Sequence, residues 1–428
     1  MSCRQRMFVL VMSALAWSSV ARGQEPASGL GLEAAVDRAI AQEPSLRAVH
    51  AEIEVARALR RQAALRPNPL VRVERRDEPG GTDSLTSVGV EWPLDLFRRS
   101  GRVETAERSL DQTRLSADDR ERLLAADVRL QYGAAAAAIR EVAVAEELLA
   151  AARQQLDLVV ARVEAGRTPP LERDLLSVEV TRLDAARLIA VGRADTALVV
   201  LKPLLGMAPT EPLRLRDPLE VLVASSLGDL PAVSTPIADA RPDIKEAAAR
   251  VSLAEARIDQ AGREGRVDMS LYGSYMRMYS GIAQPGLGAA GAFDRVRGGF
   301  NYVAAGATIS IPLLNRNQGQ VAAAQAERTG AEARLAAVDL AARAEVAAAT
   351  VRDEQARRAF EVYGSGVRDL ARRNLEVVGQ TFELGRATVF DVLAEQKRFL
   401  EIEQGYVAAA REVWEARVVL TRARGETR

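Results

Sequence analysis

The sequence predicts a mainly helical protein, a tandem duplication of long helical hairpins with four β-strands per chain. Three observations predict this fold. The residues around Gly166 recur around Gly385, 219 positions further along the chain. The 64 residues from Arg102 to Ala165 contain no proline and a single glycine. Two pairs of short segments alternate apolar and polar residues, as strands with one buried face do.

The duplication extends over most of the chain, and its period is too long for a solenoid repeat. Seven of the seventeen prolines lie between 203 and 242, which predicts an extended linker around the outside of the helices. We therefore expect a first repeat at 24–206, a proline-rich equatorial linker at 207–240 and a second repeat at 241–428. The interval of 219 residues separates five further pairs of positions: Pro93 and Pro312, Leu94 and Leu313, Arg167 and Arg386, Leu201 and Leu420, and Gly206 and Gly425.

Residues 1–23 have the pattern of a secretory signal peptide. Arg4 and Arg6 precede an apolar run that ends in small residues, and the run is too short for a transmembrane span of about 20 residues. The only cysteine, Cys3, lies inside this segment, so the mature chain has no thiol for disulfide, redox or metal chemistry. Removal of the signal peptide leaves 55 basic and 58 acidic residues in the mature chain. This near-balanced charge does not imply that the protein binds nucleic acid or an anionic surface.

Each repeat begins with a helix and continues into a β-hairpin. The first helical segment, 32–64, is expected to break near Glu43-Pro44. We place one hairpin at about 70–92. The other covers about 268–311, with its strands joined by a long, glycine-rich loop at 280–298.

A helical hairpin follows each β-hairpin, turning near Gly166 and Gly385. A glycine ends one helix, and Thr168 or Thr388 can cap the next. At 1.5 Å per residue the proline-free run is about 95 Å long, which indicates a coiled coil or the wall of a tube. The expected seam of the first hairpin steps by three and four residues: Leu149, Ala152, Leu156, Val159 and Val163. In the second hairpin the matching Leu375, Val378 and Phe382 keep this register.

No segment after the signal peptide is apolar enough for a transmembrane helix, so contact with a membrane would have to come from the strands. Four strands cannot close a barrel, and an open edge in lipid costs several kcal/mol for each unpaired backbone group. Barrels have even strand numbers from about eight upward, so at least two chains would have to combine. The alternative is a small soluble sheet packed on the helices.

The duplicated order of helix, hairpin, Pro-Leu, very long helix, Gly-Arg turn and leucine-rich helix ending at Leu201–Gly206 resembles the TolC-type outer-membrane efflux channel family. The segment Ile311-Pro-Leu-Leu-Asn-Arg-Asn-Gln-Gly319 is similar, more narrowly, to its cobalt-zinc-cadmium resistance branch. The resemblance implies a homotrimer with a twelve-stranded β-barrel in the outer membrane and a periplasmic helical tunnel. It also implies docking to a periplasmic adaptor and an inner-membrane RND-type pump, with no enzymatic activity and no cofactor.

In this family, acidic residues six positions after the turn glycine face the pore. Here these are Glu172 and Asp391, and three copies of each would form a ring at the periplasmic entrance that favours cations. The sequence departs from the multidrug type, which has a second Asp where this chain has Ala394, followed by Glu395. The Tyr that holds the closed state in that type corresponds to Phe382, which lacks the hydroxyl.

These residues also have simpler interpretations. Asp391 and Thr388 form a capping-box pattern, and Glu172 lies in a first helical turn where the helix dipole favours an anion. The two roles can coexist. Contacts with an adaptor or ordinary solvated helix ends are the alternatives for the remaining candidates at the hairpin tips: Gly166, Arg167, Gly385, Arg386 and Phe382.

The sequence leaves the transported substrate open. With no mature cysteine and one histidine, His50, a single chain cannot assemble a zinc site from Cys and His, so we predict no metal site. We expect a passive outer-membrane conduit, with heavy-metal cations as the first candidate cargo. The alternatives are a conduit for drugs or type I secreted polypeptides, and a periplasmic coiled-coil adaptor or scaffold.

Overall fold

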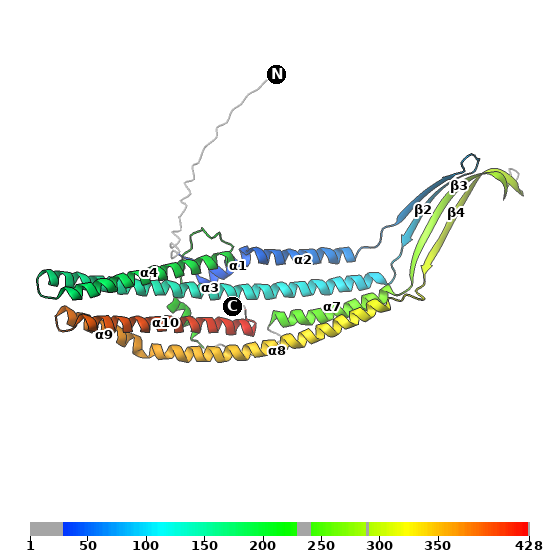
Figure 1. The fold of residues 1–428 in the computed structure, drawn as a ribbon. Helices are drawn as coiled ribbons and strands as arrows, with labels where there is room; N and C mark the ends of the chain where they lie inside the picture. The colour runs from blue at the N-terminus through cyan, green and yellow to red at the C-terminus, as the bar shows by residue number, and fades with distance from the viewer. Residues whose placement is uncertain (1–28, 229–240, 288–290, 427–428) are drawn as a thin grey trace, which may run out of the picture.

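The protein is a long helical rod with a β-sheet at one end and two helical hairpin tips at the other (Figure 1). The computed structural model describes residues 29–228, 241–287 and 291–426. The predicted signal peptide and part of the predicted linker, 229–240, lie outside these residues. None of the described helices combines the length and the apolar content needed to cross a bilayer.

The same order of elements occurs twice. The first copy contains α1 (Leu32–Gln42), α2 (Pro44–Ala63), β1 (Leu70–Asp77), β2 (Ser84–Pro93), α3 (Arg98–Glu164) and α4 (Pro170–Leu204). The second contains α7 (Pro242–Glu264), β3 (Asp268–Leu287), β4 (Phe293–Ser310), α8 (Gln318–Val362), η1 (Tyr363–Val367), α9 (Arg368–Glu383) and α10 (Val389–Arg424). A short helix, α5 (Leu219–Ser226), lies between the copies. The predicted break near Glu43-Pro44 and the predicted long helix are both confirmed.

The copies differ in the middle of their long helix. In the first copy α3 runs for 67 residues without a break. In the second copy a π-helical segment, η1, separates α8 from α9, and Gly366 within it has φ of 95°. Kinks of this kind arise at glycines and π-bulges because they interrupt the regular backbone hydrogen bonds. The corresponding segment of the first copy, 144–148, has no glycine and remains helical.

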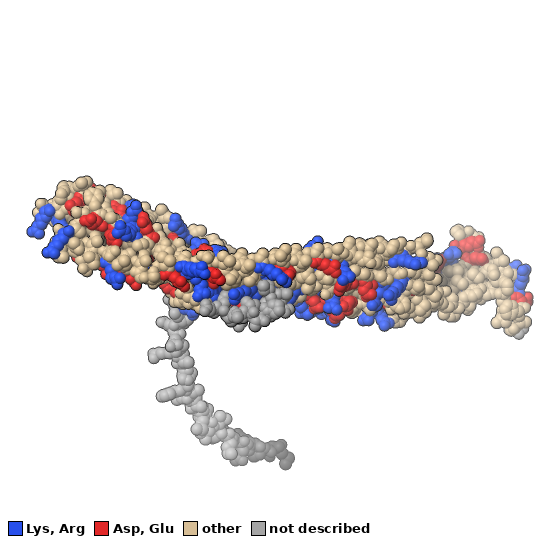
Figure 2. All heavy atoms as spheres, turned by 90° about the horizontal axis from the view of Figure 1, so that it is seen from below, with Lys and Arg blue, Asp and Glu red and all other residues tan. Residues whose placement is uncertain are grey.

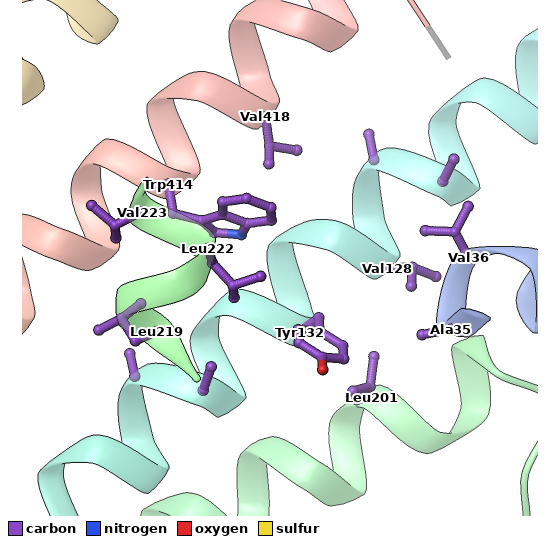
Figure 3. Close-up of a cluster of buried hydrophobic side chains, with 14 of the residues drawn as sticks. Ala35, Val36, Val128, Tyr132, Leu201, Leu219, Leu222, Val223, Trp414 and Val418 are labelled. Atoms are coloured by element: carbon purple, nitrogen blue, oxygen red, sulfur yellow. The ribbon is translucent and has the colours of Figure 1, made fainter. Parts of the chain in front are cut away.

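The largest core lies midway along the rod, where α1, α3, α5 and α10 meet (Figure 3). Tyr132 is fully buried there, and its hydroxyl donates to the carbonyl of Leu30 at 2.8 Å. Trp414 donates through Nε1 to the carbonyl of Arg129 at 2.9 Å. Trp414 packs directly on Gly133, where an added Cβ would lie 2.1 Å from the indole. Gly133, the one glycine between Arg102 and Ala165, therefore makes room for this ring.

The predicted seam of the first hairpin is buried. Leu149, Ala152 and Val159 are at most 2% exposed, and Leu156 and Val163 pack against the same clusters or next to them. These clusters also contain residues of α9 and α10, such as Phe382 and Phe399. The two hairpins therefore share one apolar interior, as an amphipathic stripe at heptad spacing requires.

The four strands form one antiparallel sheet in the order β1-β2-β3-β4. Our prediction of a long loop at 280–298 is wrong: β3 continues to Leu287, β4 begins at Phe293, and an irregularity lies between Ser280 and Gln284. The glycines there lower the intrinsic strand preference, but the ladder of backbone hydrogen bonds between the two strands outweighs it.

Candidate functional site: the two hairpin tips

Both hairpins turn with the same backbone geometry. Gly166 and Gly385 have φ of 70° and 73°, in the left-handed region that suits glycine. In each turn the glycine N–H donates to the carbonyl three residues earlier, and the following arginine N–H donates to the carbonyl five residues earlier, all at 2.9 Å. This is the Schellman motif, which satisfies the last free carbonyls of a helix. The identical pattern explains why Gly-Arg recurs in the sequence.

Arg167 and Arg386 extend from these turns into solvent. Among the residues that the structure describes, neither guanidinium has an ion-pair partner. Figure 2 shows basic side chains projecting at the hairpin end of the rod. The two predicted tip arginines are therefore free to meet a partner.

Two apolar residues at the tips were missed by the sequence reasoning. Leu171 and Phe390 are 63% and 66% exposed, and they occupy equivalent positions 219 residues apart. Each lies in the first turn of the helix after the tip, next to a residue at the predicted acidic position. The sequence could have predicted them, because both repeats have an apolar residue at this position and it does not belong to the heptad seam. An apolar residue that is not buried in a seam indicates a contact surface.

The carboxylate of Asp391 is held by a capping box. Its Oδ2 accepts the backbone N–H of Thr388 at 2.8 Å and the Thr388 hydroxyl at 2.7 Å, while the Asp391 N–H donates to Thr388 Oγ1 at 3.3 Å. These hydrogen bonds hold the pKa of the Asp391 carboxyl below its usual value. Asp391 is therefore an exposed, ionised carboxylate with a fixed orientation at the tip.

Glu172 occupies the equivalent position with a different environment. It is half-buried in the first turn of α4, and its backbone N–H donates to the Pro169 carbonyl at 3.1 Å. Within the described part of the chain its carboxylate accepts no hydrogen bond. Because Pro169 has no hydroxyl, no capping box can form here as it does with Thr388.

Arg162 joins the two tips. From α3 of the first hairpin it donates through one NH group to the Phe382 carbonyl at 3.1 Å and through the other to the Glu383 carbonyl. Its guanidinium also lies 5.4 Å from the centroid of the Phe382 ring. These carbonyls end α9 and carry the negative end of its dipole, which favours a cation. The equivalent residue of the second repeat is Thr381, so sequence symmetry did not indicate this contact.

Phe382 is not on the surface of the tip. Its side chain is 2% exposed and packs with Val159, Leu176, Val389 and Val392 between the two hairpins. Its inclusion among the residues available for adaptor contact therefore needs correction, because Phe382 occupies the seam position equivalent to Val163 and is buried there. Glu395 is also buried, with its carboxylate 3.0 Å from Arg398, so it does not extend freely from α10.

The arrangement at the tips suits electrostatic guidance of a passing solute more than chemistry. The predicted acidic positions lie at the same end of two adjacent hairpins, and the described residues contain no group of three or more His, Cys, Asp or Glu that could hold a metal ion. At the opposite end of the rod, the sheet exposes apolar side chains.

A duplicated rod of helical hairpins with a four-stranded sheet at one end defines a class of protein, the channel subunits of efflux systems. The sequence matches the family described as outer membrane efflux protein over residues 35–207 and 236–426. The chain belongs to this family. It is an outer-membrane component of an efflux system, with its helical part in the periplasm.

Individual relatives agree with this assignment. The chain is 25% identical to the nickel-cobalt-cadmium resistance protein NccC of Alcaligenes xylosoxydans xylosoxydans over 322 residues, 72% of this chain and 67% of the relative. The solved structure of CusC, described with its transmembrane channel formation, has 19% identity, a TM-score of 0.73 and coverage of 95% and 96%. The open-state MtrE outer-membrane channel of Neisseria gonorrhoeae has 21% identity, a TM-score of 0.72 and coverage of 92% and 89%.

Proposed function

We propose that three copies of this chain form a continuous duct, with a twelve-stranded barrel in the outer membrane and a helical tunnel whose periplasmic entrance is built from the hairpin tips. The observation that carries this proposal is the sheet. Its outer strands, β1 and β4, each pair on one side only. Exposed apolar residues such as Val73 and Val303, at 68% and 84%, lie on these two strands.

A face of this kind belongs in lipid, but a free strand edge does not. Inside a bilayer the unpaired N–H and C=O groups of β1 and β4 have no water to bond, so another chain must supply the partner strands. We take three chains because the family resemblance implies a trimer. Three sheets of four strands give an even number, as bacterial barrels have.

Stoichiometry and pore formation test this proposal together. We expect the purified full-length protein to have the mass of a trimer in native mass spectrometry and to produce discrete conductance steps in planar bilayers. Deletion of β1 and β2 should abolish both, because the remaining edges cannot close. Recovery of the wild-type protein as a soluble periplasmic monomer would favour an adaptor or scaffold instead.

The entrance is proposed to favour cations through Glu172 and Asp391. Three copies of each would place six carboxylates around a narrow opening, and rings of acidic side chains raise the local concentration of cations. The free carboxylate of Glu172 and the fixed, ionised carboxylate of Asp391 support this role.

Single-channel reversal potentials test the entrance. In a salt gradient, Glu172→Gln with Asp391→Asn should shift the reversal potential toward zero, because fewer fixed charges exclude anions. Glu164→Gln with Glu383→Gln is the matched control, since these exposed residues lie before the turn glycines and carry the same charge. An equal shift in both double variants would leave Glu172 and Asp391 as helix-capping residues only.

The proposed partners are a periplasmic adaptor and an inner-membrane RND-type pump, and the proposed cargo is a heavy-metal cation. The free Arg167 and Arg386, beside exposed Leu171 and Phe390, offer a surface on which adaptor hairpins can dock. The Ile311–Gly319 segment and the relation to NccC support metal cargo.

Resistance tests separate the possible cargoes. Deletion of the gene should lower the tolerated concentration of nickel, cobalt or cadmium at least several-fold and leave drug tolerance unchanged, and a plasmid copy should restore it. A loss confined to drugs or to a secreted polypeptide would reject the metal assignment while leaving the duct intact.

A further inference from the structure

The outward face of the sheet carries an apolar band of defined height. On β4 the band runs from Val303 to the end of the strand at Ser310, about 24 Å along the strand and about 18 Å when a barrel tilt of about 40° is applied. This covers most of the apolar height of about 25 Å found in outer-membrane barrels. The exposed residues of the band are Val71, Val73, Val88, Val90, Trp92, Leu271, Tyr275, Val303 and Ile309.

The band ends abruptly at a polar row. By strand register, Thr86 pairs with both Arg75 and Arg277, and Arg277 pairs with Asn301. Each member lies two residues beyond the last apolar row, on the same face and toward the hairpin turns. This is the end of the sheet farthest from the helices (Figure 1), which in the outer membrane is the external side.

Two more arginines continue this polar zone along β4. Arg295 and Arg297 are exposed, in the same alternation as Val303, whereas the alternate residues Val296, Gly298 and Phe300 are half-buried. The outward side of the sheet beyond the band thus carries four arginines, together with the exposed rings of Tyr279 and Phe293.

Acidic groups are largely absent from this side of the sheet. Asp77 is an acidic residue whose place in the strand alternation puts it on the outward face. Arg75 donates two hydrogen bonds to its carboxylate, at 2.8 and 2.9 Å. Asp83 accepts the Gly281 N–H at 2.7 Å, and Asp294 accepts the N–H of its neighbour Arg295. On the inward side Glu74 pairs with Arg76 at 2.9 Å. Across the described residues, no carboxylate lies within ion-pair distance of the remaining three outward arginines: Arg277, Arg295 and Arg297.

We propose that Arg277, Arg295 and Arg297 bind the phosphate groups of phosphorylated glycolipid in the outer leaflet. The inference rests on the proposed barrel, because it needs the apolar band to lie in lipid. Headgroup phosphates then meet the barrel just above the band, at the height of Arg277, which lies two residues beyond the last apolar row. Arg297 and Arg295 lie farther out, six and eight residues beyond Val303 on β4, about 20 and 27 Å along the strand. A guanidinium can form paired, charge-assisted hydrogen bonds with a phosphate, and basic residues near an anionic lipid surface strengthen binding to it. The balanced net charge of the whole chain does not reveal this local excess of arginines on the outward face.

Native mass spectrometry of the full-length protein in uncharged detergent tests the proposal. The probes are lipid A with two phosphates, the same lipid after dephosphorylation, and inorganic phosphate alone. Wild type should retain the phosphorylated lipid with at least tenfold preference over the dephosphorylated one, and inorganic phosphate should not substitute for it.

The variants use the two faces of one sheet. Arg277→Gln with Arg297→Gln should weaken binding of the phosphorylated lipid about tenfold or more, since each arginine near the surface contributes severalfold. Arg72→Gln with Arg76→Gln removes the same charge from the inward face of β1 and should change binding less than twofold. Both variants are first checked for trimer mass and bilayer conductance.

Three results would overturn the proposal: equal retention of both lipids, equal loss in both variants, or binding of inorganic phosphate as tight as that of the lipid. The last would indicate a free-anion site. Failure of the wild-type protein to form trimers or pores is a separate outcome, because it would reject the proposed duct itself.

Discussion

The two repeats share a chain path but differ in how their hairpins are held. In the first, the continuous α3 and α4 are joined by a seam of apolar residues and surface ion pairs. In the second, η1 interrupts the helix that leads to the tip, and a buried charge network lies beside this kink. Glu403, 1% exposed, binds Arg368 at 2.6 Å and Arg140 at 3.4 Å, and Arg368 lies 4.4 Å from the Tyr406 ring. The two copies of a duplicated architecture therefore differ, with a kink in the long helix of the second and an unbroken helix in the first.

The equivalent of Glu403 in the first repeat is Asp184, whose side chain is 40% exposed and pairs with Arg187 at 3.3 Å. One ancestral position thus supplies a buried anion in one copy and a surface anion in the other. The difference follows from Arg140 and Arg368, whose counterparts, Ala359 and Leu149, carry no charge.

Removal of Glu403 should have the largest effect on this comparison. Glu403→Ala removes the carboxylate that Arg368 pairs with and leaves Arg140 with Glu220 alone, and the loss of such a buried partner costs about 3–5 kcal/mol of unfolding free energy. Asp184→Ala, the matched change, should cost less than about 0.5 kcal/mol. Denaturant unfolding followed by helical circular dichroism measures both. Similar costs would show that burial does not distinguish the two positions.

The kink itself should respond to glycine substitution in opposite directions. Gly366 has a positive φ, so Gly366→Ala should destabilise by about 1–2 kcal/mol. Gly364 lacks this restriction and has open space around it, so Gly364→Ala should stabilise by up to about 1 kcal/mol. Thermal melting of the purified variants measures both. If both variants are stabilised, or both destabilised, the positive φ of Gly366 and the absence of such a restriction at Gly364 would be contradicted.

The contact of Arg162 with α9 should be detectable as local protection at the second tip. Arg162→Ala removes two hydrogen bonds to the last carbonyls of α9, and we expect amide exchange at residues 382–386 to accelerate about tenfold. Arg167→Ala, which removes an exposed guanidinium from the same hairpin, should leave it unchanged. Hydrogen exchange with mass spectrometry measures the difference. Unchanged exchange in both would mean that the seam alone holds the tips together.

The smallest expected effect concerns pH at the capping box. The folded-state pKa of Asp391 is lowered by its hydrogen bonds with Thr388, so its contribution to stability is present above the unfolded pKa and is lost as pH falls through the folded value. Protection from amide exchange, taken relative to the intrinsic rate at each pH, should therefore fall in acid more at the start of α10 than at the start of α4. Thr388→Ala should remove this excess. If the start of α10 still loses more protection in acid in Thr388→Ala, a titrating group other than Asp391 causes that loss.

Much of the site was predictable because it depends on local geometry. Gly166 and Gly385 predict a turn with left-handed backbone because glycine adopts that conformation easily. The spacing of Thr388 and Asp391 predicts a capping box. Phe382 and Arg162 were different. Phe382 keeps the heptad register, at the position equivalent to Val163, and its burial confirms that prediction, whereas its availability for contact at the tip does not hold. Arg162 was not considered, because its partner is a backbone carbonyl 220 positions away and such a contact leaves no mark in the periodicity of α3.

The amino-acid sequence by itself determined the duplication, the hairpins, their turns and the number of strands, because proline, glycine and apolar spacing act over a few residues. Tertiary structure alone decided how far β3 and β4 extend, which acid of an equivalent pair is buried and which arginine joins the tips. Those outcomes depend on the contacts between two segments that are distant in the sequence. The hydrogen-bond partners and the loss of hydration at such a contact depend on both segments and cannot be derived from either one alone.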